Sequence, residues 1–162
     1  MLSRRPRRGD DGSAAVEFAI VGSLLFLILL GIVQFGIAFN RSQGLQAAAR
    51  EGARIASLPA STSAAIQQRI RNTVSIVDGT NLSPACPANP SSLPADRGCI
   101  RIQRRSSGGA LITVNGAAAR PCENQTGATV LITVFYRSEI TVPLWKSQKV
   151  TLSGEGEFAC EA

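Results

Sequence analysis

Residues 18–40 read FAIVGSLLFLILLGIVQFGIAFN, and none of these 23 residues is charged. As a helix the stretch would be roughly 34 Å long, at about 1.5 Å per residue, which is enough to cross a hydrocarbon core of about 30 Å. Residues 24–30 are apolar on every helical face, whereas a surface helix of a soluble protein keeps one polar face. The stretch therefore predicts a transmembrane helix.

The charges around this stretch predict its orientation. The basic segment Arg4–Arg8 contains four arginines and precedes it, and three arginines follow within about 15 residues of its other end. The positive-inside rule therefore favours a cytoplasmic N-terminus. Every cysteine lies downstream, where a disulfide framework would require export: Cys86, Cys99, Cys122 and Cys160. We expect a single-pass protein of the cytoplasmic membrane with an exported C-terminal domain.

Glu17 stands immediately before the apolar stretch. An ionisable group at a membrane segment is costly and is by default a functional candidate. If the chain were cut between Gly12 and Ser13, the new α-amino group and the Glu17 carboxylate would lie about 6 Å apart along one helix face. Each charge would neutralise the other, or its equivalent on a neighbouring chain. In an uncut chain, Glu17 is an interfacial residue favoured by the helix dipole.

Four segments follow one another in a distinctive order: GSAAVEFA (12–19), the leucine run, GIVQFG (31–36) and AAAREGAR (47–54). Together they resemble the TadE-like family, pseudopilin-like proteins of the tight-adherence (Tad/Flp) pilus, over about residues 9–57. The resemblance implies a type IV-like minor pilin whose leader is removed by a prepilin peptidase after Gly12. It also implies that Glu17 and Phe18 are the Glu-Phe pair used in assembly. The implied partners are the membrane, the major Flp pilin, other minor pilins and the assembly platform, with cell adhesion as the process.

We expect the helix to continue through Ser57 and to stop near Pro59, because proline disfavours helix at the residue before it. Small residues recur at intervals of four in this extension: Gly44, Ala48, Gly52 and Ala56. This small-residue stripe is either the contact face for the helix of another pilin subunit or a feature of an alanine-rich helix. Gln34, within the apolar stretch, either hydrogen-bonds to another helix or is only tolerated there.

The remaining chain predicts an α+β domain packed on the emerging helix. The division is a leader (1–12), a transmembrane and assembly helix (13–57) and an exported domain (58–162). We expect a second helix over 61–77, ended by Asp78-Gly79, and an irregular loop over 80–98. Strand patterns cover 99–104, 110–114, 128–137, 140–144 and 149–158. They predict a small antiparallel, pilin-like sheet, with a hairpin turn at Ser138-Glu139 and an edge strand at Pro143.

Four cysteines allow three pairings, and we favour Cys86–Cys99 with Cys122–Cys160, on sequence proximity and elimination. The chain has no histidine, and its cysteine spacings lack any Cys-x-x-Cys, so we expect neither a metal nor another cofactor. Arg101, Arg104 and Arg105 form a basic cluster without a neighbouring aromatic in sequence. We interpret this cluster as a solvated strand end and expect no nucleic-acid partner.

No phosphate loop, nucleophile motif or carboxylate pair at a catalytic spacing is present, so an enzyme is not expected. The sequence favours a structural or assembly protein. The alternative is an uncleaved single-pass anchor that presents an exported binding domain. Cleavage after Gly12 would remove four arginines and two aspartates and lower the formal net charge from +6 to +4.

Overall fold

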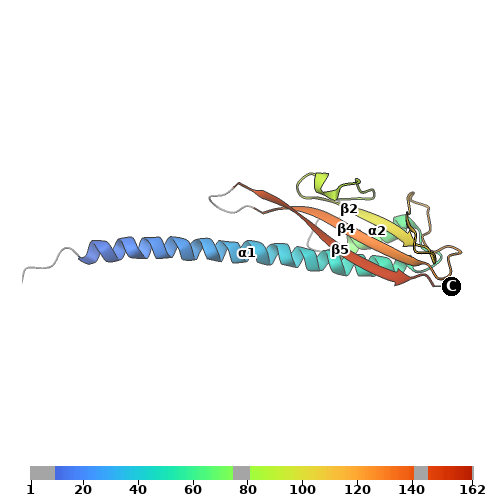
Figure 1. The fold of residues 1–162 in the computed structure, drawn as a ribbon, viewed down its shortest axis with the longest axis horizontal. Helices are drawn as coiled ribbons and strands as arrows, with labels where there is room; N and C mark the ends of the chain where they lie inside the picture. Colours follow the sequence, from blue (N-terminus) through green and yellow to red (C-terminus); the bar gives the residue numbers. More distant parts are fainter. Residues whose placement is uncertain (1–9, 75–80, 141–145, 162) are drawn as a thin grey trace, which may run out of the picture.

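A computed structural model of the chain describes residues 10–74, 81–140 and 146–161. Its dominant element is α1 (Asp10–Ala56), a single helix of 47 residues. Figure 1 shows the first half of α1 projecting from the molecule, while its second half lies along the sheet. The expected α+β class with a long N-terminal apolar helix is therefore confirmed.

The helix ends where the sequence predicts, close to Pro59. Ser57 Oγ donates to the Arg54 carbonyl at 2.8 Å as the chain leaves α1. The next helix, α2 (Ser63–Thr73), is capped by Thr62, whose hydroxyl accepts from the Ala65 backbone N–H at 3.3 Å. It is shorter than the expected 61–77, and the terminating Asp78-Gly79 pair lies outside the described residues.

The sheet is mixed, with strand order β1-β2-β4-β5 and with β3 also paired to β2. Its strands are β1 (Leu82–Ser83), β2 (Arg97–Arg105), β3 (Leu111–Thr113), β4 (Thr129–Ile140) and β5 (Gln148–Ala159). The prediction of a wholly antiparallel sheet is wrong at one edge, because β1 runs parallel to β2. This short strand lies in the segment expected to be an irregular loop, where only two residues align with β2.

The predicted hairpin turn at Ser138-Glu139 is also wrong. Both residues belong to β4, and they pair with Val150 and Lys149 of β5. The hydroxyl of Ser138 accepts a hydrogen bond from Arg41 of α1, so this buried polar side chain has a partner while it remains in the strand. Of the strand predicted over 140–144, only Ile140 is described, and it is the last residue of β4. Pro143 lies outside the described residues.

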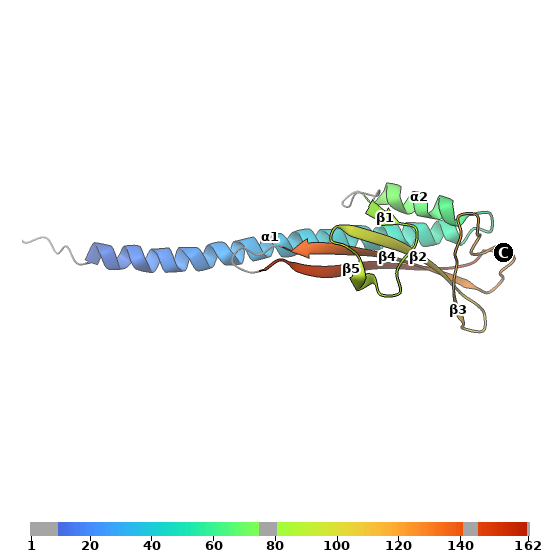
Figure 2. The same cartoon turned by 90° about the horizontal axis from the view of Figure 1, so that it is seen from above.

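The core lies between the sheet and the two helices. Figures 1 and 2 show the sheet along the second half of α1, with α2 beside that half. The alternation of β4 directs one face inward, so that every second side chain is buried against the helices. The largest buried side chains are Leu45, Ile66, Ile70, Leu82, Ile100, Val130, Ile132 and Val134.

The other face of the sheet carries the segment that contains the 3₁₀ turn η2 (Pro90–Ser92). Cys86 of this segment is bonded to Cys99 of β2, and Cys122 is bonded to Cys160. These are the two pairs that the sequence analysis favoured. The Arg101 guanidinium donates to the Pro87 carbonyl at 2.9 Å and lies 5.0 Å from the centre of the Phe135 ring.

The basic cluster is therefore not a solvated strand end. Arg101 is half-buried under the proline-rich segment, and Arg104 donates to the Pro121 carbonyl at 3.3 Å. Arg105 forms an ion pair with Glu157 at 3.0 Å. Sequence alone did not show that β4 would place Phe135 beside Arg101. Arg101 and Arg104 hold loops to the sheet, and Arg105 links β2 to β5, so all three have a structural role.

Candidate membrane and assembly helix

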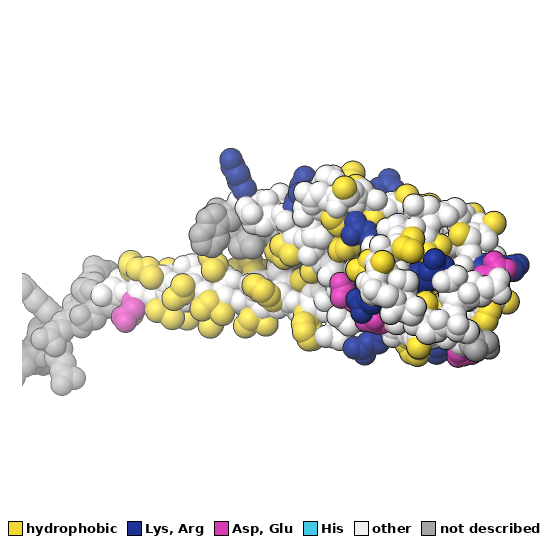
Figure 3. Space-filling model, turned by 45° about the vertical axis from the view of Figure 1, so that its right-hand side comes forward, with side chains coloured by type: hydrophobic (Ala, Val, Ile, Leu, Met, Phe, Trp, Pro, Cys, Tyr) yellow, Lys and Arg dark blue, Asp and Glu magenta, His cyan; other side chains and the backbone are white. Residues whose placement is uncertain are grey.

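The first half of α1 exposes almost all of its large apolar side chains. Phe18 is 79% exposed and Phe35 is 78% exposed. Figure 3 shows yellow apolar side chains along the visible face of the projecting part of the helix. Among the described residues, α1 is the one helix long and apolar enough to cross a membrane. A single N-terminal apolar helix with these exposed side chains indicates membrane anchoring of the C-terminal domain.

The candidate processing and assembly residues all lie on α1. Gly12 and Ser13 are helical, so the bond proposed for cleavage lies within the first turn of the helix. Ser13 and Glu17 are both exposed and are separated by one helical turn. Glu17 is the one charged residue between Gly12 and Asn40. The helix thus presents a single carboxylate at the head of an apolar surface.

The small-residue stripe packs against this chain rather than another. Ala48, Gly52 and Ala56 are buried in the core. A Cβ added to Gly52 would lie 2.5 Å from Ile70 Cγ1 of α2 and 3.4 Å from Ile132 Cδ1 of β4. The interpretation of these three residues as a contact face for another subunit is therefore wrong, because α2 and the sheet already cover them. Gly44 is half-buried at the membrane side of this face.

Two glycines of β5 complete this contact, and the sequence analysis did not identify them. A Cβ added to Gly154 would collide with the backbone of Leu45 and Gln46. A Cβ added to Gly156 would lie 2.7 Å from the Arg50 Cα. The strand backbone therefore lies directly on the helix backbone. The available signal was the alternating sequence GEGE over 154–157. In a strand the two glycines lie on one face of the sheet and the two glutamates lie on the other.

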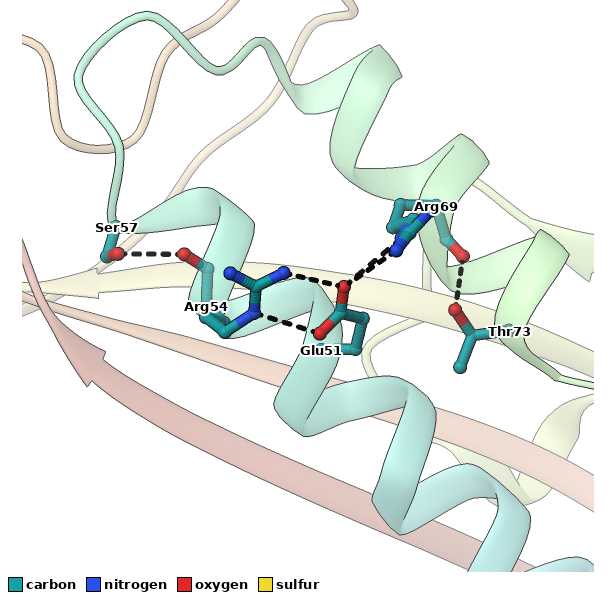
Figure 4. Close-up of polar contacts among 5 residues, drawn as sticks. All are labelled: Glu51, Arg54, Ser57, Arg69 and Thr73. Carbon is teal, nitrogen blue, oxygen red and sulfur yellow. Dashed lines mark hydrogen bonds and ion pairs between the residues drawn. The ribbon is translucent and has the colours of Figure 1, made fainter.

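A charged cluster joins α1 to α2 on the surface (Figure 4). The Glu51 carboxylate accepts from Arg54 at 3.0 Å and from Arg69 of α2 at 3.1 Å. Hydrogen bonds from Arg54 and then Arg69 lower the pKa of Glu51 from an ordinary 4.5 to about 2. The carboxylate is therefore ionised wherever the protein is folded under physiological conditions, and it ties the two helices together.

Arg41 stands where the apolar half of α1 meets the domain. Its Nη1 donates to the Ser138 hydroxyl at 2.6 Å, and its guanidinium lies 5.9 Å from the centre of the Tyr136 ring. On the same face one and two turns earlier, Ala38 and Gln34 are half-buried, although their neighbours Phe35 and Phe39 are exposed. Gln34 and Ala38 thus lie on the same face of α1 as Arg41.

The described residues contain no group of three or more His, Cys, Asp or Glu side chains that could hold a metal ion. All four cysteines are in disulfides.

Comparison with known families gives one match. Residues 12–54 match the family model described as TadE-like protein. The match covers the apolar half of α1 and most of its domain half, including Glu17, Gln34 and Gly52. No curated protein and no solved structure matches the chain significantly.

Proposed function

We propose, from the TadE-like match over residues 12–54, that this chain is a minor pilin or pseudopilin of a Tad/Flp pilus. The family match supports a Tad pilus-associated protein with a membrane-anchoring helix. In the finer proposal, a prepilin peptidase cleaves between Gly12 and Ser13. The mature helix then packs with the major Flp pilin and other minor pilins on the assembly platform, and the role is structural rather than enzymatic.

The observation that carries this proposal is the position of Glu17. It is the one charge between Gly12 and Asn40, on a helical surface made mostly of large, exposed apolar side chains. A carboxylate at such a place is unfavourable unless it is neutralised. Cleavage would create an ammonium group on Ser13, one helical turn away, and a neighbouring subunit would carry the same group. The carboxylate is therefore suited to setting the axial position of one helix against the next.

The domain supports an exported location. Disulfides persist in oxidising compartments, and both bonds lie in the part of the chain that follows α1. We therefore place the N-terminus in the cytoplasm and the domain outside the cytoplasmic membrane. A different kind of processing, in which a signal peptidase removes everything through Ala49 as a secretory signal, is not compatible with the second half of α1. Such a cut would delete Leu45, Ala48 and Ala49 from the core.

Mass spectrometry of the chain extracted from membranes of its native host tests the processing step. We expect a mature N-terminus at Ser13. An intact N-terminus at Met1 or Leu2 would contradict the proposal and favour the alternative, an uncleaved anchor that presents a binding domain. A Gly12→Ala variant provides the matched sample, and we expect it to retain its leader in the same membrane fraction.

The substitution Glu17→Gln tests the assembly step, because it keeps the size of the side chain and removes its charge. We expect normal membrane insertion and normal cleavage, with loss of pilus assembly or of this chain from the sheared pilus fraction. Gln34→Ala is a control that changes a polar residue elsewhere on the apolar half. Full piliation with Glu17→Gln, and normal incorporation of this chain, would exclude Glu17 as the assembly carboxylate.

A further inference from the structure

The register between β5 and α1 shows how far the sheet extends toward the membrane. Gly156 lies against Ala49 and Arg50, whereas Gly154 lies against Leu45 and Gln46. Two residues of the strand therefore span the same length as four residues of the helix. This is expected because a strand rises about 3.4 Å per residue and a helix about 1.5 Å. Moving toward the start of β5 means moving toward the apolar half of α1.

The end of the β4–β5 pair is level with that apolar half along the helix axis. Arg41, the first charged residue after the apolar stretch, already contacts Ser138. Beyond this contact, β4 and β5 continue for two more residues, to the pair Ile140 and Gln148. Figures 1 and 2 both show the start of β5 level, along the long axis, with the blue apolar part of α1, and Figure 1 shows it set apart from the helix.

This arrangement changes the position expected for the bilayer. If residues 18–40 were all within the hydrocarbon core, the β4–β5 end would lie within it too. Residues 13–33 form an alternative span of about 31 Å, at about 1.5 Å per residue, which also crosses the core. Gln34, Ala38 and the β4–β5 end would then lie at the exported interface of the membrane.

The residues at this end fit such an interface. Lys146 and Lys149 are the only lysines in the chain, and both are exposed. Val150 is 39% exposed and points to the α1 side of the sheet, as do Gln148 and Ile140, whereas Lys149 points to the other side, opposite Glu139 of β4. Figure 3 shows a dark-blue side chain projecting from the domain at the end nearest the yellow apolar helix. Lysine places its charge among lipid headgroups while its methylenes contact apolar surface.

We propose that the β4–β5 end is a second membrane contact, in which Lys146 and Lys149 bind the anionic headgroups of a phospholipid bilayer. This proposal rests on the insertion of α1 and is independent of leader cleavage and of pilus assembly. The contact holds the domain against the membrane surface.

The single tryptophan, Trp145, is adjacent to Lys146 in sequence and serves as a reporter. The full chain is reconstituted in vesicles of phosphatidylcholine alone or with about 30% phosphatidylglycerol, and tryptophan emission is quenched with aqueous acrylamide. We expect the anionic lipid to reduce quenching about twofold or more, and about 0.5 M salt to reverse this protection. Flotation of the vesicles verifies separately that α1 has inserted.

The double variant Lys146→Gln, Lys149→Gln is expected to lose the protection that depends on phosphatidylglycerol. The control, Arg105→Gln with Arg120→Gln, removes the same number of positive charges from exposed ion pairs elsewhere in the domain. We expect the control to keep the protection. Equal quenching in the two kinds of vesicle, or equal loss of protection in both double variants, would overturn the proposal. Failure of pilus assembly in the host would leave this result unaffected.

Discussion

The two halves of α1 use opposite kinds of side chain, although they form one unbroken helix. Residues 12–40 carry large apolar side chains, such as Phe18 and Phe35, that point outward. Residues 41–56 instead carry alanine and glycine where the helix meets the sheet, and Ala48, Ala49 and Ala53 are completely buried. The bulkier half is the exposed half, which is the reverse of a soluble protein.

This contrast follows from what each half packs against. Lipid is fluid and adapts to large side chains, so the outward phenylalanines and leucines need no complementary shape. The sheet has a fixed shape, and it approaches α1 so closely that Gly154 and Gly156 are required on its own side. Both halves of α1 are thus apolar, but the membrane half exposes large side chains and the domain half lets two backbones come into contact.

The largest effect is expected from Gly154→Val. Valine favours strands, but its Cβ would collide with the backbone of α1, which has no rotamer by which to move away. We expect the free energy of unfolding to fall by about 3 kcal/mol or more. Pulse proteolysis of the detergent-solubilised chain in urea measures it.

Ser153→Val is the matched control, because Ser153 is exposed and lies on the other face of β5. We expect a change within about 0.5 kcal/mol for this control. Equal unfolding midpoints for the two valine variants would contradict the close contact between β5 and α1.

An intermediate effect is expected from Gly52→Leu in the domain half of α1, and Gly36→Leu in the apolar half is its control. Gly52→Leu introduces a side chain against Ile70 and should destabilise the domain by about 2–3 kcal/mol. Gly36→Leu lies in the exposed half, where an added Cβ meets no atom within 4 Å. We expect this second variant to unfold like the unmodified chain in the same urea assay. Similar losses from both variants would remove the distinction between the halves.

The smallest effect is expected from Glu51→Gln, in the charged cluster that joins α1 to α2, and its size depends on pH. Because the pKa of Glu51 falls from 4.5 to about 2 on folding, the unfolded chain binds more protons between these values. The stabilising contribution of Glu51 is therefore complete above about pH 4.5 and is lost as the pH falls toward 2.

The measurement compares the unfolding midpoints of the unmodified chain and of Glu51→Gln from neutral to acid pH. We expect a modest advantage for the unmodified chain at neutral pH, since Arg54 and Arg69 are more than half exposed. The two midpoints should converge in acid. A difference that stays constant down to pH 2 would show that the ion pairs do not stabilise the folded chain.

The sequence predicted α1 well because a long apolar run, a proline after it and a charge-free interior are local signals. It also predicted the positions of β2, β4 and β5 from alternation. It did not predict the partner of Gly52, because a stripe of small residues indicates close packing without indicating which chain supplies the other surface. The parallel pairing of β1 and the continuation of β4 through Ser138 depend on distant contacts with β2 and Arg41.

The candidate site divides in the same way. Gly12, Ser13, Glu17 and Phe18 are recognisable from sequence because their order along one helix is itself the signal. The contacts of Arg41 and Gly154 are not, because Arg41 meets Ser138 of β4, and Gly154 meets α1, only when the sheet packs along the helix.

The continuity of α1 also has a mechanical consequence. The helix passes from the membrane half into the domain core without a linker, so a pull on the anchor acts directly on the domain. Strand β5 lies lengthwise along the helix, as the contacts of Gly154 and Gly156 show. Tension along α1 is therefore resisted as shear over the whole length of that contact, rather than by opening the sheet one residue at a time. The Cys122–Cys160 bond secures the far end of β5, so the load cannot strip this strand from the domain.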